Sequence, residues 1–180
     1  VAANDYKSNK VTSFSVVRYG NVIGSRGSVI PFFLEQAKKN EFTITDLKMT
    51  RFMISLEQGV QLVWKAFEDM VGGEIYVKKI PSIKVLDIAK SISEKAKIKI
   101  IGIRPGEKLH ESMISTDDAS LTYEYGTYYK ILPSIKLKSF SKMIKKGKKV
   151  KSSFSYTSDK NKKWMPSKEL KRWIKKLEKN

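Results

Sequence analysis

The 180-residue chain contains no cysteine and one histidine, His110. Without cysteine there is no disulfide and no thiolate zinc site, and a reducing cytoplasm is the expected compartment. His110 has no second histidine or cysteine with which to share a metal, so we interpret it as structural and expect no metal site. No apolar run reaches bilayer-spanning length and no signal-peptide pattern opens the chain, so we expect no membrane association.

Arginine is also scarce, with five residues in a chain whose formal net charge is +18. Residues 136–180 carry 17 basic and 3 acidic residues, a balance of +14, and the first 135 residues carry only +4. Reading of nucleic-acid bases favours arginine forks over lysine. We therefore interpret the tail as a solvated lysine face and do not expect nucleic acid. A lysine-rich module that binds nucleic acid or another anionic surface remains the alternative.

A hydrophobic content of 41% is that of a globular chain, long enough for one ordinary domain or part of a larger one. Strand and helix patterns alternate from Val11 to about Met113, which predicts an α/β fold with short, parallel-type connections. The expected strands lie at 11–19, 42–45, 74–80 and 97–103. The expected helices lie at about 30–37, 55–71, 85–92 and 104–113.

Two of these helices carry specific expectations. Ser55 with Gln58 forms a capping box, and the helix that follows is expected to turn its apolar residues toward the core. Those residues are Val60, Val63, Trp64 and Phe67. Pro105 suits the first turn of a short helix over 104–113. From about Thr116 the pattern weakens to an aromatic hairpin around Gly126 and two amphipathic helices, at 140–146 and 167–177.

Tyr6 and Lys10 have the spacing of a phenol and the ammonium that lowers its pKa on one helix face. Ser8 and Asn9 favour a turn, however, and a β-branched strand begins at Val11. Lys10 is therefore expected in a loop leaving the helix, and we interpret the spacing as coincidental. The chain opens with valine and with helix-like sequence, which suggests that it is the back part of something longer.

The first candidate site is the segment RYGNVIGSRGSVIPFF, residues 18–33. A strand end rich in glycine and serine lets backbone N–H groups approach a phosphate or a nicotinamide, and ligands of open α/β sheets lie beyond such ends. Asn21 and Arg26 would supply fixed polar contacts. The alternative is an ordinary strand-to-helix turn with Arg26 in solvent.

Two further segments carry polar groups in predicted loops. In IGIRPGE, residues 101–107, Arg104 could meet a diphosphate and Glu107 could accept from ribose hydroxyls, although an Arg/Glu pair flanking a turn is more often a surface ion pair. In ITDLKMTRF, residues 44–52, the polar groups are Thr45, Asp46 and Arg51. Turn formation alone would account for Asp46.

Taken in order, four motifs resemble one family closely. They are SFSVVRYGNVIGSRGSVIPFF, ITDLKMTRF, GGEIYVKKIPS and IIGIRPGEKLHE. The chain resembles the C-terminal half of the inverting UDP-N-acetylglucosamine 4,6-dehydratases, which are extended short-chain dehydrogenase/reductases of capsule and flagellin-glycan biosynthesis. The likeness runs from Val1 to about Met113, with a looser echo in FSYTSDKNKKW, and the HE after RPGEKL resembles the pseudaminic-acid pathway type.

The resemblance implies a fold and a reaction. Residues 1–115 would form the C-terminal part of a Rossmann-like core with a small substrate-binding subdomain, and residues 116–180 a lysine-rich extension. NADP would oxidise the C4 hydroxyl of the sugar, water would leave across C5 and C6, and the hydride would return to C6 with C5 inverted. The substrate would be UDP-N-acetylglucosamine or a related UDP-sugar, and a homo-oligomer is expected by analogy.

The resemblance also assigns residues. NADP is expected along Val22, Ile23, Gly24, Ser25 and Arg26. The UDP-sugar is expected at Asn21, Val29, Thr45, Arg104 and Glu107. The family's glycine-rich fingerprint, catalytic Asp–Lys pair and Tyr-x-x-x-Lys helix lie upstream of the matched stretch, so we expect no catalytic residue in the chain and no activity from it alone. A nucleotide-sugar binding remnant without catalysis is the third possibility.

Overall fold

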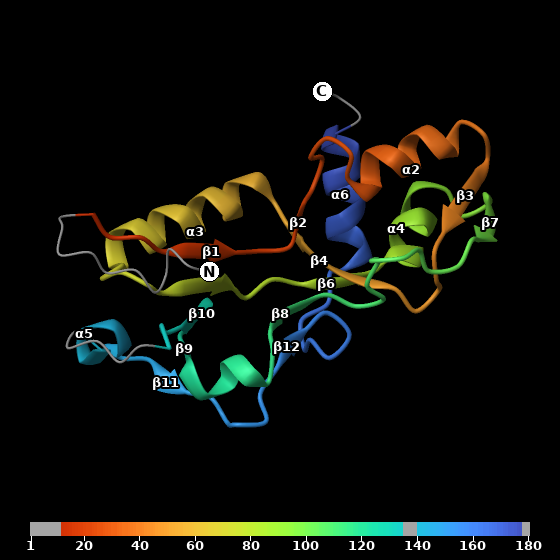
Figure 1. Cartoon of the computed structure of the whole chain (residues 1–180). Helices are drawn as coiled ribbons and strands as arrows, with labels where there is room; N and C mark the ends of the chain where they lie inside the picture. The colour runs from red at the N-terminus through yellow and green to blue at the C-terminus, as the bar shows by residue number, and fades with distance from the viewer. Residues whose placement is uncertain (1–11, 135–139, 178–180) are drawn as a thin grey trace. The chain divides into compact units, whose positions relative to one another are not determined.

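A computed structural model describes residues 12–134 and 140–177 (Figure 1). The chain divides into two compact units, each assembled from separate stretches of sequence. Unit 1 comprises Val1–Tyr19, Glu57–Lys79 and Ser112–Tyr156. Unit 2 comprises Gly20–Leu56, Ile80–Glu111 and Thr157–Asn180. The expected boundary near residue 115 stays a prediction, and the Tyr6–Lys10 spacing lies outside the described residues.

Unit 1 is built on a five-stranded sheet with the order β1-β5-β10-β9-β11. The strands are β1 (Val16–Arg18), β5 (Ile75–Lys78), β9 (Thr122–Glu124), β10 (Tyr128–Ile131) and β11 (Lys148–Lys149). β1 runs parallel to β5, and the other pairings are antiparallel. The remaining elements are α3 (Leu56–Asp69), β8 (Ser112–Ile114), the 3₁₀ helix η1 (Asp117–Leu121) and α5 (Phe140–Ile144). The hairpin predicted around Gly126 is confirmed as β9 and β10.

α3 begins directly after Ser55, but its buried face is not the one predicted. Leu62 and Ala66 pack with Tyr76 and Tyr128 in the core of unit 1. The residues expected inside are exposed, by 46% for Val60 and Val63, 61% for Trp64 and 67% for Phe67. The prediction was wrong because both faces of this helix are apolar, and hydrophobic periodicity cannot say which face the sheet covers.

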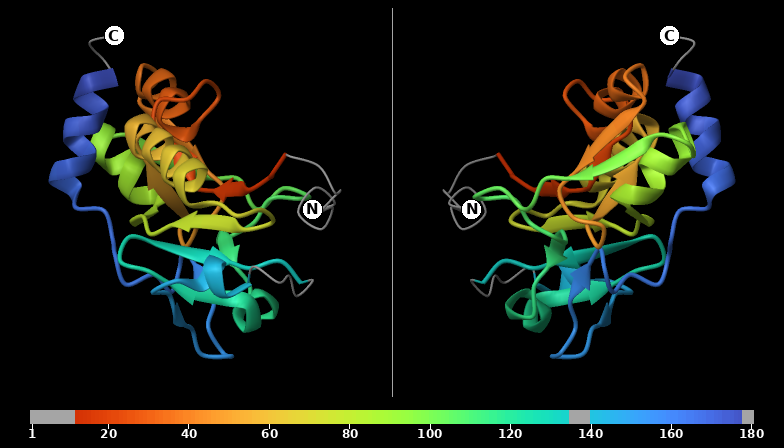
Figure 2. Two further views of the ribbon diagram at one scale, coloured as in Figure 1. Left: turned by 90° about the vertical axis from the view of Figure 1, so that its left-hand side faces the viewer. Right: turned by 90° about the vertical axis from the view of Figure 1, so that its right-hand side faces the viewer.

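Unit 2 combines a three-stranded sheet, order β2-β4-β6, with a parallel pair, β3-β7. The strands are β2 (Asn21–Val22), β4 (Thr50–Ile54), β6 (Ser82–Lys84), β3 (Glu41–Ile44) and β7 (Lys97–Ile100). The helices are α2 (Val29–Ala37), α4 (Val85–Ile92) and α6 (Ser167–Leu177), which lies beside α4 (Figure 2). The chain enters the unit for the last time in β12 (Tyr156–Thr157).

The core of unit 2 draws on all three stretches of the unit. Phe33 of α2, Phe42 of β3 and Ile88 of α4 are buried together with Leu170 and Ile174 of α6. The tail helix is therefore a core element on its apolar stripe, while its lysines lie on the exposed side. Across the described residues, no helix combines the length and the apolar content needed to cross a bilayer.

Glycine allows the closest backbone approach in unit 2. A Cβ added to Gly20 would lie 2.5 Å from both the Cβ and the carbonyl oxygen of Phe52. Since real contacts are never that short, only glycine lets the chain pass so near β4 as it enters β2. β2 then pairs in parallel with β4, with Asn21 opposite Met53. The glycine thus fixes where the first polar residue of the candidate site lies.

The helix predicted over residues 104–113 does not form, and that prediction was wrong. Residues 105–106 form a turn, in which Gly106 has a φ of 81°, and Glu107 N–H donates to the Arg104 carbonyl at 3.0 Å. The carbonyl of Leu109 accepts from Thr50 N–H at 3.1 Å. A helix does not continue because Gly106 adopts a left-handed conformation and because the Leu109 carbonyl is already hydrogen-bonded to β4.

Candidate functional site

Unit 2 holds a cavity of about 340 Å³. Its walls come from β2, the start of α2, the end of β3, β4 and the turn after β7. All five predicted substrate residues line it: Asn21, Val29, Thr45, Arg104 and Glu107. Asn21 and the turn around Arg104, which lie more than 80 positions apart in the sequence, therefore face one space. That convergence is the geometric requirement of the predicted site.

The Arg104–Glu107 turn is braced by the glutamate itself. Glu107 accepts from the Arg104 backbone N–H at 3.4 Å, and its other carboxylate oxygen accepts from the Thr45 hydroxyl at 3.2 Å. The contact with Thr45 joins the turn to the end of β3. The Arg104 side chain stays exposed at the cavity. The turn thus presents one cation and one hydrogen-bond acceptor to the same space.

Arg51 also lines the cavity and is the second arginine among the lining residues. The side chain of Arg51 is 14% exposed, and its Nη1 donates to the carbonyls of Thr50 at 2.8 Å and Leu109 at 3.2 Å. From the sequence, Arg51 was expected in a loop and had no assigned contact, but it lies within strand β4. The signal that could have selected Arg51 is its position as the one charged residue within the otherwise uncharged strand TRFMI.

The other polar residues near the cavity have structural partners. Asp46 forms a turn, because its carboxylate accepts from Lys48 N–H at 2.6 Å, as the turn interpretation expected. His110 Nδ1 lies 2.8 Å from the Thr50 hydroxyl. The part of the chain that the structure describes contains no cluster of three or more groups able to hold a metal.

The predicted cofactor segment, residues 22–26, adjoins the cavity without lining it. Ile23 packs against the core, and the Ser25 hydroxyl donates to the Val22 carbonyl at 2.8 Å. A Cβ on Gly24 would lie 2.3 Å from Leu177 Cδ2, so the glycine makes room for α6. The side chain of Arg26 is exposed. The exposed part of this segment is therefore formed by Ser25 and Arg26.

The cavity suits a ligand that has both anionic and apolar parts. Two guanidiniums and one carboxylate supply the charges, and apolar side chains such as those of Phe32, Phe33 and Ile101 supply the rest of the wall. Among the described residues that line it, Glu107 is the sole carboxylate, and none is a lysine, tyrosine or histidine. The cavity can bind and orient, but it carries no acid–base pair of its own.

Comparison with known proteins points to the same family as the sequence motifs. The sequence model of a family described as "Polysaccharide biosynthesis protein" matches residues 1–133. UDP-N-acetylglucosamine 4,6-dehydratase (inverting) of Campylobacter jejuni strain 81-176 is 55% identical over 179 residues, covering 94% of this chain and 53% of that protein. UDP-glucose 4-epimerase of Rickettsia canadensis is 41% identical over 164 residues, covering 88% and 48%.

Among solved structures, Pen from Bacillus thuringiensis matches with a TM-score of 0.82 and 33% identity, covering 98% of this chain and 54% of that one. The fold is the C-terminal part of an extended short-chain dehydrogenase/reductase. The chain belongs to the polysaccharide biosynthesis protein family and, within it, is closely similar to the inverting UDP-N-acetylglucosamine 4,6-dehydratases. It spans about half the length of the curated relatives that it matches.

Proposed function

We propose that the chain supplies the sugar-nucleotide site of an NADP-dependent UDP-N-acetylglucosamine 4,6-dehydratase, a lyase that inverts C5. The observation that carries the proposal is the convergence of Asn21, Arg51, Arg104 and Glu107 on one cavity in unit 2. Similarity to a dehydratase and to an epimerase whose names both contain a UDP-sugar supports this substrate class.

We assign each residue a part in binding. Arg51 and Arg104 would hold the diphosphate from two sides, because planar guanidinium donors match phosphate oxygens. Glu107 would accept from ribose hydroxyls, and Asn21 would contact the sugar. Val29 and Thr45 would complete the wall. By fixing the nucleotide at several points, these residues would place the hexose C4–C6 edge against the groups that carry out the reaction.

A nicotinamide cofactor would supply the hydride acceptor and donor of the dehydration. Val22, Ile23, Gly24, Ser25 and Arg26 are proposed to lie along it, and the exposed Ser25 and Arg26 can supply polar contacts. These residues would contact one side of the nicotinamide cofactor and would not surround it. Catalytic acid–base groups are therefore proposed to come from outside the described residues, and the 180 residues alone are proposed to be inactive.

The remaining assignments rest on family resemblance. They are a cytoplasmic location, a homo-oligomer and a product that feeds surface-polysaccharide or flagellin-glycan (pseudaminic acid) biosynthesis.

The test uses the full-length protein. UDP affinity and dehydration of UDP-N-acetylglucosamine are measured for the unchanged protein and for Arg104→Ala. Loss of one charged hydrogen-bonding partner predicts UDP binding weaker by about 10- to 100-fold.

The matched control is Lys175→Gln with Lys176→Gln, on the exposed face of α6. This control should leave UDP affinity unchanged. If the control weakened binding as much as Arg104→Ala, the lysine-rich anionic-surface alternative would be favoured. A 4-epimer in place of a 4-keto-6-deoxy product would transfer the assignment to the epimerase class.

A further inference from the structure

The Arg51 side chain is held in place by hydrogen bonds to neighbouring backbone groups. Two backbone carbonyls, those of Thr50 and Leu109, fix one nitrogen of its guanidinium at 2.8 and 3.2 Å. These carbonyls belong to segments that meet through the 3.1 Å hydrogen bond from Thr50 N–H to Leu109. The direction of the guanidinium therefore depends on whatever holds residues 109–111 against the start of β4.

A serine from the C-terminal stretch forms that connection. Ser158 is fully buried, and its hydroxyl oxygen lies 2.7 Å from the Thr50 hydroxyl and 3.2 Å from the Thr50 carbonyl. It also accepts from Glu111 N–H at 2.9 Å. The Ser158 backbone N–H donates to the Glu111 carbonyl at 2.8 Å. One residue thus joins both segments that carry the carbonyl partners of Arg51.

Glu111 completes the support. One carboxylate oxygen accepts from Phe52 N–H at 2.7 Å, and the other lies 3.9 Å from Arg51 Nε. With a side chain 28% exposed, the carboxylate is shielded enough for its charge to act on the neighbouring guanidinium. Glu111 therefore holds the position next to Arg51 and balances the Arg51 charge.

We propose that Ser158 and Glu111 are positioning residues for Arg51, and that through them the C-terminal stretch belongs to the nucleotide site. The proposal rests on the proposed function, because it assigns Arg51 to the diphosphate. Binding sites need the contacting group held within a fraction of an ångström by a supporting layer of hydrogen bonds. The FSYTSD segment, residues 154–159, then has a role in ligand affinity, although its sequence resembles the family only loosely.

The experiment measures UDP and uridine binding by calorimetry in the full-length protein. Ser158→Ala removes the joining hydroxyl, and Glu111→Gln keeps the shape of the side chain but removes its charge. Ser158→Ala should weaken UDP binding by about 3- to 10-fold, the effect of one hydrogen bond, and Glu111→Gln by about 2- to 5-fold, the effect of one partly exposed ion pair. Both should leave uridine binding unchanged. Ser153→Ala, an exposed serine of the same tail, is the matched control and should change neither.

A double-mutant cycle separates positioning from general stability. In an Arg51→Met background, Ser158→Ala and Glu111→Gln should have no further effect on UDP binding, because their target is gone. Equal losses for UDP and uridine, or undiminished losses in that background, would overturn the proposal. Unchanged UDP affinity in Glu111→Gln would also overturn it. This variant conserves the volume of the side chain, so it still tests the proposal if Ser158→Ala fails to fold. Absence of UDP binding by the unchanged protein would instead count against the proposed function.

Discussion

Glu111 shows how burial sets the behaviour of a single residue. Burial raises the pKa of its carboxyl above the ordinary value, and the hydrogen bond from Phe52 N–H and the charge of Arg51 offset this only in part. The folded protein then binds this proton more tightly than the unfolded chain does. A raised folded-state pKa contributes stability at pH values below the unfolded pKa, and that contribution is lost as pH rises through the folded pKa.

The stability of the protein should therefore depend on pH through the Glu111 carboxyl. Between pH 4 and pH 7, the unfolding free energy of the unchanged protein should fall relative to that of Glu111→Gln, which has no proton to lose. Urea titrations at several pH values measure the difference. A difference that stays constant across this range would show that Glu111 titrates as it does in the unfolded chain.

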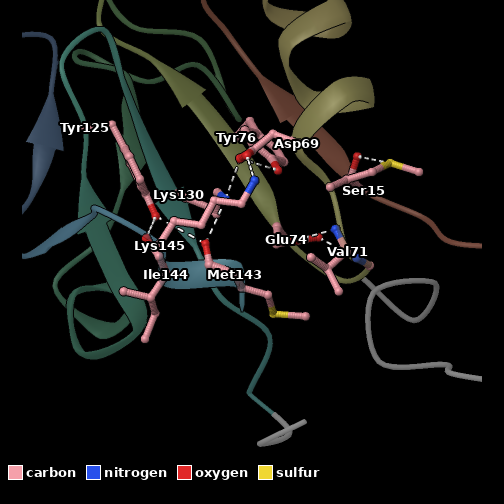
Figure 3. A network of polar contacts seen from close by, with 12 residues as sticks. Ser15, Asp69, Val71, Glu74, Tyr76, Tyr125, Lys130, Met143, Ile144 and Lys145 are labelled. Carbon is pink, nitrogen blue, oxygen red and sulfur yellow. Dashed lines mark hydrogen bonds and ion pairs between the residues drawn. The ribbon is translucent and has the colours of Figure 1, made fainter. Parts of the chain in front are cut away.

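At the scale of elements, a buried ion pair joins α3 to β10 (Figure 3). Lys130 of β10 is fully buried, and its Nζ donates to Asp69 at 2.6 Å and to the Met143 carbonyl at 2.9 Å. Lys145 forms a second ion pair with Asp69. Burial alone would raise the pKa of Asp69, but its hydrogen bonds and charge interactions with both lysines outweigh it, and the net pKa is lowered.

Asp69 also lies at the C-terminal end of α3, where the helix dipole disfavours a negative charge. The ion pairs with Lys130 and Lys145 offset this effect. Asp69→Asn should destabilise the chain by about 3–5 kcal/mol, because it leaves Lys130 buried without its counter-charge. Chemical denaturation measures the loss. Adding Lys130→Met should recover most of it, and Lys145→Gln, at a half-exposed side chain, is the mild control. A double variant as unstable as Asp69→Asn would contradict this account.

Among the described residues, the outer face of α3 is an unusual surface. Leu56, Val60, Val63, Trp64 and Phe67 are all at least 46% exposed. The rings of Trp64 and Phe67 meet edge to face, with centroids 6.2 Å apart. Soluble chains rarely leave so continuous an apolar stripe in water. Its free energy of burial favours association of the isolated chain.

The 180-residue chain is therefore expected to self-associate as its concentration rises. Light scattering after gel filtration should show a mass above that of the monomer. Trp64→Gln with Phe67→Gln should return the chain to monomer, whereas Lys65→Gln, an exposed polar position on the same helix, should not. If the chain stays monomeric without any substitution, the stripe is not sufficient to drive association.

Much of the candidate site could be predicted because its residues lie in motifs that are continuous in the sequence. Asn21 and Val29 flank one glycine-rich segment, and Arg104 and Glu107 one turn, so each pair could be selected without knowing the fold. Arg51 could be named but not assigned, because a strand residue reaches the cavity only through pairing with distant segments. Ser158 could not be selected at all, since its partners lie 47 and 108 positions away.

Neighbouring residues were enough to predict the alternation of helices and strands, the hairpin around Gly126, the amphipathic tail helices and the family, because local propensity and short motifs depend on neighbouring residues. The folded structure was needed to show which face of α3 is buried, that the Arg104 segment forms a turn and that Lys130 is buried. These outcomes depend on which of several distant segments becomes buried or hydrogen-bonded against another, and a local sequence pattern does not contain that information.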